Sequence, residues 1–408
     1  MADDTSLKKL AHLTRITPPP LVGSEDIVTE LCAALFAGFR RYDQRVRARQ
    51  YMDGLLRAEG RKSIANIAAA VGVPGDEQRL HHFVSSSPWA VNPVRKALAA
   101  FLEEDDLPSA WVALPVSIPK AGEHTVGVSR HFSPDSGQLV NGQRAYSMWY
   151  ASERVVAPVS WRLNLHNAWL RDNRRRTEAE DPDELSAATP EDCVTGLLDD
   201  VRRWGNSTRL VMMDARGADE QRHLAGLFER ESPVAVRISG QTLLTLGDQG
   251  RGGGHGEHLA PARTVLDPAR RLRSVLRRKE RHEPAGELPL ATATAGVRLP
   301  ASGEAERSAR GRLGHLTLLG VWHDLRRPPA ELWLTNIDQP SAVSLLRMTQ
   351  LIHTVSSGWR TRGETIGLRD YEGRSFQGWH RHMTLGSCAY AMLALRSAGP
   401  ANGSGLSA

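Results

Sequence analysis

The stretch Trp111-Val-Ala-Leu-Pro-Val116 is the point at which the hydrophobic pattern of this chain changes from a period of 3.6 residues to a period of two. Two similar stretches follow, His124–Val128 and Arg144–Tyr150, with proline and glycine residues between them. Short apolar runs bounded by turn residues are typical of strands. The pattern therefore predicts three antiparallel strands in a meander, which Val155–Leu165 would extend.

The segment after this meander alternates helical and strand-like patterns. Helices are expected from about Pro190 to Trp204 and from Asp219 to Arg230, and short apolar strands at Leu210–Asp214 and Val234–Ile238. Three antiparallel strands followed by helix, strand, helix and strand is the order of a ribonuclease-H-like core. We therefore predict a mixed α/β fold class built on such a core.

Changes in composition divide the rest of the chain. Residues 25–105 show helical spacing, residues 240–329 are rich in glycine and arginine with a strand-like stretch near Leu313–Trp322, and Ser341–Leu395 is again helical. The domains predicted in this way are a flexible N-terminus (1–24), a helical N-terminal domain (25–105), the first part of the core (108–240), a basic β-rich insertion (241–330), a helical end of the core (331–396) and a flexible tail (397–408).

Cysteine usage and hydropathy exclude several protein classes. Cys32, Cys193 and Cys388 are far apart and match no metal-ligand spacing, which argues against a disulfide framework and against a zinc site. The chain opens with no basic-then-apolar leader, and no apolar run approaches the roughly 18 residues that a membrane span requires. These features predict a soluble, cytoplasmic protein with no membrane partner.

Positive charge is concentrated in one region of the chain. Residues 261–330 hold 14 Arg and Lys against 7 Asp and Glu, a local excess of +7 beside a net charge of +6 for the whole chain. Such a concentration favours binding to the phosphate backbone of a nucleic acid. A solvated arginine-rich loop is the alternative interpretation.

The N-terminal helices contain a pattern that is compatible with a helix-turn-helix. Ser63–Val71 and Glu77–Val84 are both helical in spacing, with Gly72-Val-Pro-Gly75 between them. The second helix carries Arg79, His81 and His82, which could contact DNA. Any pair of helices in a helical bundle gives the same pattern, so structural packing is the favoured interpretation and DNA binding the alternative.

The C-terminal stretch Tyr371-Glu-Gly-Arg-Ser-Phe-Gln-Gly-Trp-His-Arg-His-Met-Thr-Leu385 resembles the signature of DDE transposases of the insertion-sequence 701 family. The resemblance extends over most of residues 40–395 and includes the segments Gln50–Leu56, Gln78–Phe83, Pro119–Gly122, Thr125–Val128, Met213–Asp214 and Gly367–Phe376. It implies a ribonuclease-H-like catalytic core with an inserted β-rich domain. Double-stranded DNA is the implied partner, a homodimer is left open, and Mg²⁺ would be a cofactor only in an active enzyme.

The chemistry of that family requires three carboxylates, which hold two divalent metal ions. The resemblance places the first acid on the first core strand, where this chain has Leu114 and Pro115. The second acid matches Asp214, and the third falls eleven residues before Gly367, at Ser356. Since Mg²⁺ prefers oxygen ligands, Leu114 and Pro115 cannot replace an acid and Ser356 would do so poorly. Asp214 is thus the only acid in register and a weak metal ligand at most.

Other residues could act in place of the missing acids. Glu364 or Glu372 could substitute for the third acid, and Asp135 or Glu153 for the first. Asp214 could also have no catalytic role and simply cap the following helix.

The residues predicted to contact DNA are Arg79, His81 and His82 in the N-terminal helices, Arg270, Arg271, Arg273, Arg277, Arg278 and Lys279 in the insertion, and Arg374 and Arg381 in the C-terminal signature. Arg374 and Arg381 could equally form salt bridges with Glu372 or Asp370.

Three functions are compatible with these observations. The first is a transposase-like DNA-binding protein that no longer cleaves DNA, the second an active transposase with displaced acids, and the third a non-enzymatic interaction protein that keeps only the fold. We expect the first, because two of the three acids are absent.

Overall fold

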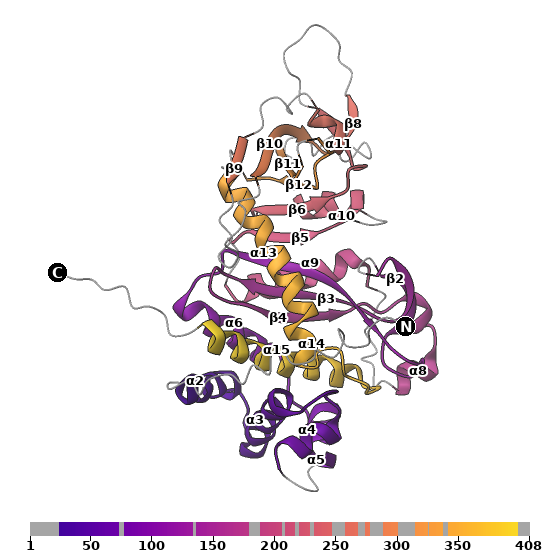
Figure 1. Ribbon diagram of the computed structural model, residues 1–408. Helices are drawn as coiled ribbons and strands as arrows, with labels where there is room; N and C mark the ends of the chain where they lie inside the picture. The colour runs from indigo at the N-terminus through magenta and orange to yellow at the C-terminus, as the bar shows by residue number, and fades with distance from the viewer. Residues whose placement is uncertain are drawn as a thin grey trace, which may run out of the picture.

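A computed structural model shows the architecture of the chain (Figure 1). It describes residues 24–72, 77–133, 136–178, 188–205, 209–216, 220–228, 232–246, 258–267, 274–277, 289–300, 315–324, 326–337 and 342–398. The predicted flexible ends, 1–24 and 397–408, lie largely outside these residues.

A mixed β-sheet forms the centre of the molecule. Strands β1 (Ala110–Pro119), β3 (Gln138–Ala151) and β4 (Val156–Leu163) pair antiparallel, and β5 (Val211–Asp214) and β6 (Val234–Ile238) follow in parallel beside β1. The resulting order β4-β3-β1-β5-β6 is that expected of a ribonuclease-H-like fold. The predicted fold class is therefore confirmed.

One predicted strand was wrong. Residues 124–127 form a turn, and the strand is β2 (Val128–Ser133), which pairs with the first half of β3. Gly122 and Gly127 have φ angles of 98° and 72°, which an extended strand does not allow. The turn is held by Gln143, whose Nε2 donates to the carbonyl oxygen of Val126 at 2.7 Å.

The predicted insertion continues the central sheet. Its strands in the described residues are β7 (Leu243–Leu246), β8 (Leu259–Pro261), β9 (Ser274–Arg277), β10 (Pro289–Arg298) and β11 (Leu316–Trp322). Strand β12 (Glu331–Thr335) pairs antiparallel with β6 on one side and with β11 on the other. The sheet accordingly runs without a break from the core into the upper part of Figure 1.

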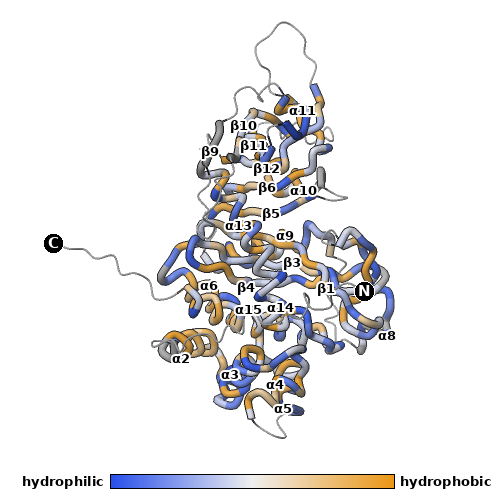
Figure 2. Tube along the Cα trace, in the orientation of Figure 1, coloured by the Kyte–Doolittle hydropathy of each residue, from blue (hydrophilic) through white to orange (hydrophobic). Residues whose placement is uncertain are grey.

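Helices flank the sheet and form a group below it in Figure 1. The lower group consists of α2 (Ser24–Phe36), α3 (Tyr42–Arg57), α4 (Ile64–Ala70), α5 (Glu77–Ser85) and α6 (Val91–Asp105). The helices along the core and the insertion are α7 (Asn167–Leu170), α8 (Asn173–Glu178), α9 (Pro190–Arg203), α10 (Glu220–Phe228), α11 (Ala262–Val265), α13 (Ala342–Arg360), α14 (Arg362–Thr365) and α15 (Phe376–Ala398). Figure 2 shows α2 as largely hydrophobic and α3 as largely hydrophilic.

Helix α15 joins the lower helices to the sheet. It contacts β4 on one side and α2, α3, α5 and α6 on the other. Residues 378–392 of this helix are all buried, including His380, Arg381 and His382. A helix that is buried all round belongs to a continuous core, which here connects the two parts of the molecule.

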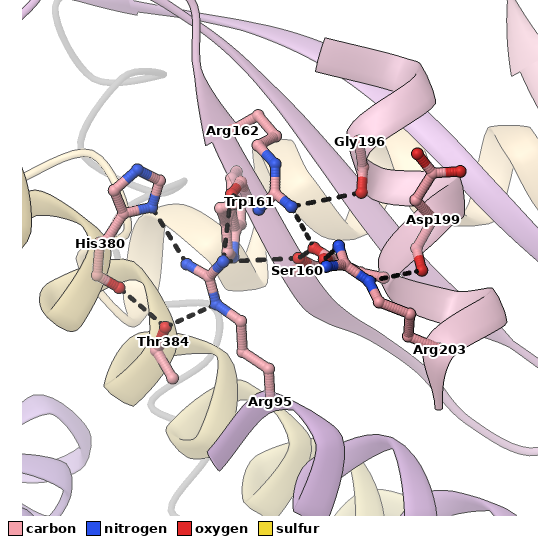
Figure 3. A network of polar contacts seen from close by, with 10 residues as sticks. Arg95, Ser160, Trp161, Arg162, Gly196, Asp199, Arg203, His380 and Thr384 are labelled. Atoms are coloured by element: carbon pink, nitrogen blue, oxygen red, sulfur yellow. Dashed lines mark hydrogen bonds and ion pairs between the residues drawn. The ribbon is translucent and has the colours of Figure 1, made fainter. Parts of the chain in front are cut away.

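A buried arginine reinforces this connection (Figure 3). Arg95 of α6 is 1% exposed, and its Nε donates to the hydroxyl of Thr384 at 2.9 Å. Its other nitrogens lie 3.2 Å from Nδ1 of His380 and 3.2 Å from the carbonyl oxygen of Trp161. Burial lowers the pKa of Arg95 to about 9, so the group stays charged at neutral pH. Elements α6, β4 and α15 thus meet at one buried cation.

Candidate active site

Asp214 lies at the carboxyl end of β5, next to β1. In the parallel pairing of these strands Met213 is opposite Ala113, so Leu114 is the β1 residue nearest in register to Asp214. Leu114 is buried and Pro115 is partly exposed. Helix α13, which carries the partly exposed Ser356, contacts both strands. The structure thus places on neighbouring elements the three positions that the resemblance assigns to acids.

The carboxylate of Asp214 is bound by arginines. Arg216 donates from Nε to Oδ1 at 2.9 Å and from Nη2 to Oδ2 at 2.7 Å, which is the two-pronged geometry of a strong arginine–carboxylate pair. Arg237 is directly opposite Asp214 in the β5–β6 register, and its Nη1 lies 3.6 Å from Oδ2. Both carboxylate oxygens therefore face positive charge.

A second carboxylate continues this network. Arg237 Nη2 lies 3.5 Å from Oε1 of Glu331, a residue of β12 that is 8% exposed. His353 of α13 places Nε2 2.6 Å from the same oxygen, and the Trp333 indole N–H donates to Oε2 at 2.9 Å. Burial alone would raise the pKa of Glu331, but these bonds and the charge of Arg237 lower it to about 2. Glu331 is therefore ionised at neutral pH.

These donors do not suit a divalent metal ion. Mg²⁺ needs several hard oxygen ligands. At the three positions assigned to acids, the chain has one carboxylate that pairs with two arginines, an aliphatic side chain at Leu114 and a hydroxyl at Ser356, and the nearby Glu331 is already bound by Arg237, His353 and Trp333. Within the described ranges no group of three His, Cys, Asp or Glu side chains is arranged to hold a metal. The residues present fit a salt-bridge cluster better than a metal centre.

A family model for the DDE superfamily endonucleases matches residues 34–285, which is more than half of the chain. The chain belongs to this superfamily. Among curated proteins, no relative matches it. The match covers helices α3 to α6, strands β1 to β9 and the arginine-rich part of the insertion. No described helix is long and apolar enough to cross a membrane.

Two of the acids considered as substitutes in this DDE superfamily protein form ion pairs with arginines. Glu364 of α14 lies 3.8 Å from Nη1 of Arg369, and its side chain is 69% exposed. Glu372 forms an ion pair with Arg61, which lies between α3 and α4. Glu153 is exposed in the turn between β3 and β4, and Asp135 lies outside the described residues. Glu364 and Glu372 therefore pair with arginines and not with the elements around Asp214.

The residues predicted to bind DNA have different environments. Arg79, His81 and His82 are exposed on α5, and Arg374 is exposed just before α15. Arg277 lies in β9, and the other insertion residues, Arg270, Arg271, Arg273, Arg278 and Lys279, lie outside the described part of the chain.

Arg381 does not fit the predicted role in DNA binding. It is 7% exposed, its Nη1 donates to the carbonyl oxygens of Val84 and Ser85 at 3.2 and 2.8 Å, and its Nε donates to that of Trp89 at 3.3 Å. These carbonyls are at the end of α5 and just beyond it, where helix carbonyls lack partners within the helix. We therefore assign Arg381 to packing of the N-terminal helices and do not retain it as a DNA contact.

The segment Arg369–Tyr371, at the start of the C-terminal signature, has a structural role in this DDE superfamily protein. Lys120 Nζ donates to the carbonyl oxygens of Arg369 and Tyr371 at 2.6 and 2.7 Å, and the backbone N–H of Lys62 donates to Asp370 at 2.8 Å. Burial lowers the pKa of Lys120 to about 8. The loop before α15 therefore ties the end of β1 to the N-terminal helices.

Four residues of the site were missed in the sequence: Arg216, Arg237, Glu331 and His353. One signal was available, because Arg237 is the only charged residue in the apolar strand Val234–Ile238. A lone charge inside a buried strand requires a partner. The parallel register supplies that partner in Asp214, but Glu331 and His353 are brought in by contacts that no local pattern indicates.

Proposed function

We propose that this DDE superfamily protein is a transposase-like DNA-binding protein that does not cleave DNA by two-metal chemistry. One observation carries the proposal: the side chain of Asp214 is held by Arg216 at 2.7 and 2.9 Å and faces Arg237 at 3.6 Å. A carboxylate in this setting would have to give up its arginines before it could bind a metal ion.

The neighbouring positions support the same conclusion. Two-metal phosphoryl transfer depends on carboxylates that bridge the ions and fix their geometry. Leu114 offers no ligand atom and Ser356 offers only a neutral hydroxyl, which is a poor ligand for Mg²⁺. The origin in the insertion-sequence 701 family and a cytoplasmic location are parts of the same proposal, which leaves a homodimer open.

DNA binding is proposed from the exposed and basic residues. Arg79, His81 and His82 lie on the exposed face of α5, and the insertion carries the local excess of positive charge. Neutralisation of phosphates releases counterions, so affinity should fall steeply as the salt concentration rises. Charge reversal of Arg273, Arg277 and Arg278 together should weaken binding to all duplex sequences.

The test is a cleavage and strand-transfer assay on duplex DNA that the protein retains from a random-sequence pool. We expect no nicked, cut or joined product with Mg²⁺ or Mn²⁺, and the same result for Asp214→Ala. Metal-dependent cleavage that Asp214→Ala abolishes would show an active transposase, and Glu364 and Glu372 would then be mutated first. Absence of any DNA binding would instead favour an interaction protein that keeps only the fold.

A further inference from the structure

We propose that the exposed side of helix α3 binds the phosphate backbone of duplex DNA through a stripe of three arginines, Arg45, Arg49 and Arg57. The inference rests on the proposed function, since it assumes that the protein binds DNA. It adds a binding surface on a helix that the structure describes throughout its length, apart from α5 and the insertion.

Positive charge is concentrated in α3 and the two residues before it. Residues 40–57 hold six arginines, two aspartates and neither lysine nor glutamate, which gives a net charge of +4. Glu59 lowers this excess to +3, and Arg61 is neutralised by its ion pair with Glu372. The largely hydrophilic character of α3 in Figure 2 agrees with this count. A positive excess on one surface helix attracts a polyanion such as DNA.

The three arginines lie on the side of α3 that faces solvent. Arg45, Arg49 and Arg57 are exposed. The opposite side is buried and consists of Ala48, Tyr51, Met52, Gly54 and Leu55. At a rise of about 1.5 Å per residue, Arg45 and Arg57 are about 18 Å apart along the helix axis. One strand of a duplex has a phosphate about every 3.4 Å of its axis, so the stripe is long enough to reach several phosphates.

The donors of the stripe are available to a ligand. Neither Arg49 nor Arg57 forms a side-chain hydrogen bond or ion pair with any residue that the structure describes. Arg45 uses Nε to donate to the carbonyl oxygen of Phe39 at 3.0 Å, which leaves the N–H groups on both Nη atoms for another acceptor. Arginine matches the geometry of a phosphate group and stays charged at any physiological pH.

The buried side of α3 fixes the helix in place. A Cβ added at Gly54 would lie 2.4 Å from Cγ2 of Ile67, so α3 and α4 are in close contact. Helix α3 also contacts α15, which is buried over most of its length. A stripe on a fixed helix loses only side-chain freedom when it binds, and this lowers the entropic cost of binding.

The experiment measures binding of the full-length protein to two fluorescent duplexes of unrelated sequence by anisotropy, over a range of salt concentrations. The double variant Arg49→Gln/Arg57→Gln should lower the affinity about tenfold or more. It should also reduce the salt slope by about 1.8, at about 0.9 for each phosphate contact. Both duplexes should show the same loss, because backbone contacts carry no sequence information.

Two further double variants are the controls. Arg171→Gln/Arg347→Gln removes the same charge from two other exposed arginines that form no hydrogen bond or ion pair within the described part of the chain, and it should change the affinity less than about twofold. Arg49→Lys/Arg57→Lys keeps the charge of α3 and should retain the salt slope. Thermal unfolding of each variant checks that the fold is retained.

An acid on the same side of the helix gives a test of opposite sign. Asp53 is partly exposed and lies four residues from Arg49 and four from Arg57, yet it forms an ion pair with neither. Asp53→Asn should raise the affinity, because it removes a negative charge that repels the phosphates.

Each result decides the question. If the two glutamine variants weaken binding equally, or if the lysine variant loses as much as Arg49→Gln/Arg57→Gln, the α3 stripe is refuted and the proposed function stands. A loss confined to one duplex would show base reading and would overturn the backbone assignment. If the wild type does not bind DNA, the proposed function fails and this inference fails with it.

Discussion

The hydroxyl of Tyr51 lies 2.8 Å from Nδ1 of His382, so helix α3 near the start of the chain is hydrogen-bonded to helix α15 near its end. The other ring nitrogen of His382 lies 2.9 Å from the carbonyl oxygen of Gly367. A neutral ring satisfies both contacts if Nε2 donates to Gly367 and Nδ1 accepts from Tyr51. Burial is the main reason that the pKa of His382 is lowered to about 4.

The lowered pKa of His382 predicts that the protein loses stability in mild acid. Because the folded-state pKa is below the ordinary value of 6.5, the unfolded chain binds the proton more readily between about pH 6.5 and pH 4. The contribution of His382 to the free energy of unfolding is thus fully present above pH 6.5 and decreases as the pH falls through this window, by up to about 3 kcal/mol. Urea unfolding at pH 7.5, 6 and 5 measures the decrease.

His382→Gln is the control for that prediction. Glutamine can still donate and accept hydrogen bonds but does not titrate, so the variant should lose less stability than the wild type between pH 7.5 and pH 5. Equal pH dependence in the two proteins would show that His382 is not the group responsible. His380 and the acidic groups are common to both proteins and cancel in the comparison.

The loop before α15 predicts a glycine requirement at position 367. Gly367 has a φ of 80°, and a Cβ added there would lie 2.6 Å from Cβ of Lys62. Gly367→Ala should therefore combine backbone strain of about 1 kcal/mol with overpacking of about 1–3 kcal/mol. Gly60→Ala is the matched control, because Gly60 has a φ of 63° but no atom within 4 Å of an added Cβ. A similar drop in melting temperature for both variants would contradict this crowding.

Substitution of the buried Arg95, shown in Figure 3, should destabilise the protein far more than substitution of its exposed neighbour Lys96. Arg95→Ala removes the donor to the hydroxyl of Thr384 and one of the two donors to the carbonyl of Trp161, the other being Arg162. It also opens a cavity in the core, so we expect a loss of about 3 kcal/mol or more. Lys96→Ala, on the exposed side of the same helix, should change stability by no more than about 0.5 kcal/mol. Chemical denaturation of both variants compares the two values.

The arginines around Asp214 predict that divalent metals do not stabilise the protein. A ligand raises the melting temperature only in proportion to its occupancy of the folded state. Millimolar Mg²⁺ should therefore shift the melting temperature by less than about 1 °C relative to EDTA. A rise of several degrees that disappears in Asp214→Asn would mean that the carboxylate exchanges its arginines for a metal ion.

The sequence predicted those elements whose hydrophobic pattern is local. Val234–Ile238 is a strand with the expected bounds, and the helix expected from Pro190 to Trp204 is α9. The strand predicted at His124–Val128 was wrong, because the alternation of apolar residues does not reveal that Gly127 adopts a positive φ. The hydrophobic pattern shows which residues are apolar. It does not show which glycine adopts a positive φ, because that depends on the tertiary contacts around the glycine.

Polar partners were harder to predict, because they come from distant parts of the chain. Arg381 looks like a surface residue in sequence, yet its acceptors belong to the segment Val84–Trp89, nearly 300 positions away. The cluster around Asp214 combines residues of β5, β6, β12 and α13. Only the register of the folded sheet brings these charges together.

The pairing of β6 with β12 has a consequence for the order in which the chain can fold during synthesis. Strand β6 ends at Ile238, but the strand that covers its edge begins only at Glu331, after the whole insertion has been made. Until then the nascent core has an exposed strand edge, which is a site for unwanted pairing with other chains. Strands β10 and β11, which pair with each other within the insertion, can form earlier. Strand β12, the last strand of the sheet to be synthesised, can therefore pair with β6 only after the whole insertion has been translated.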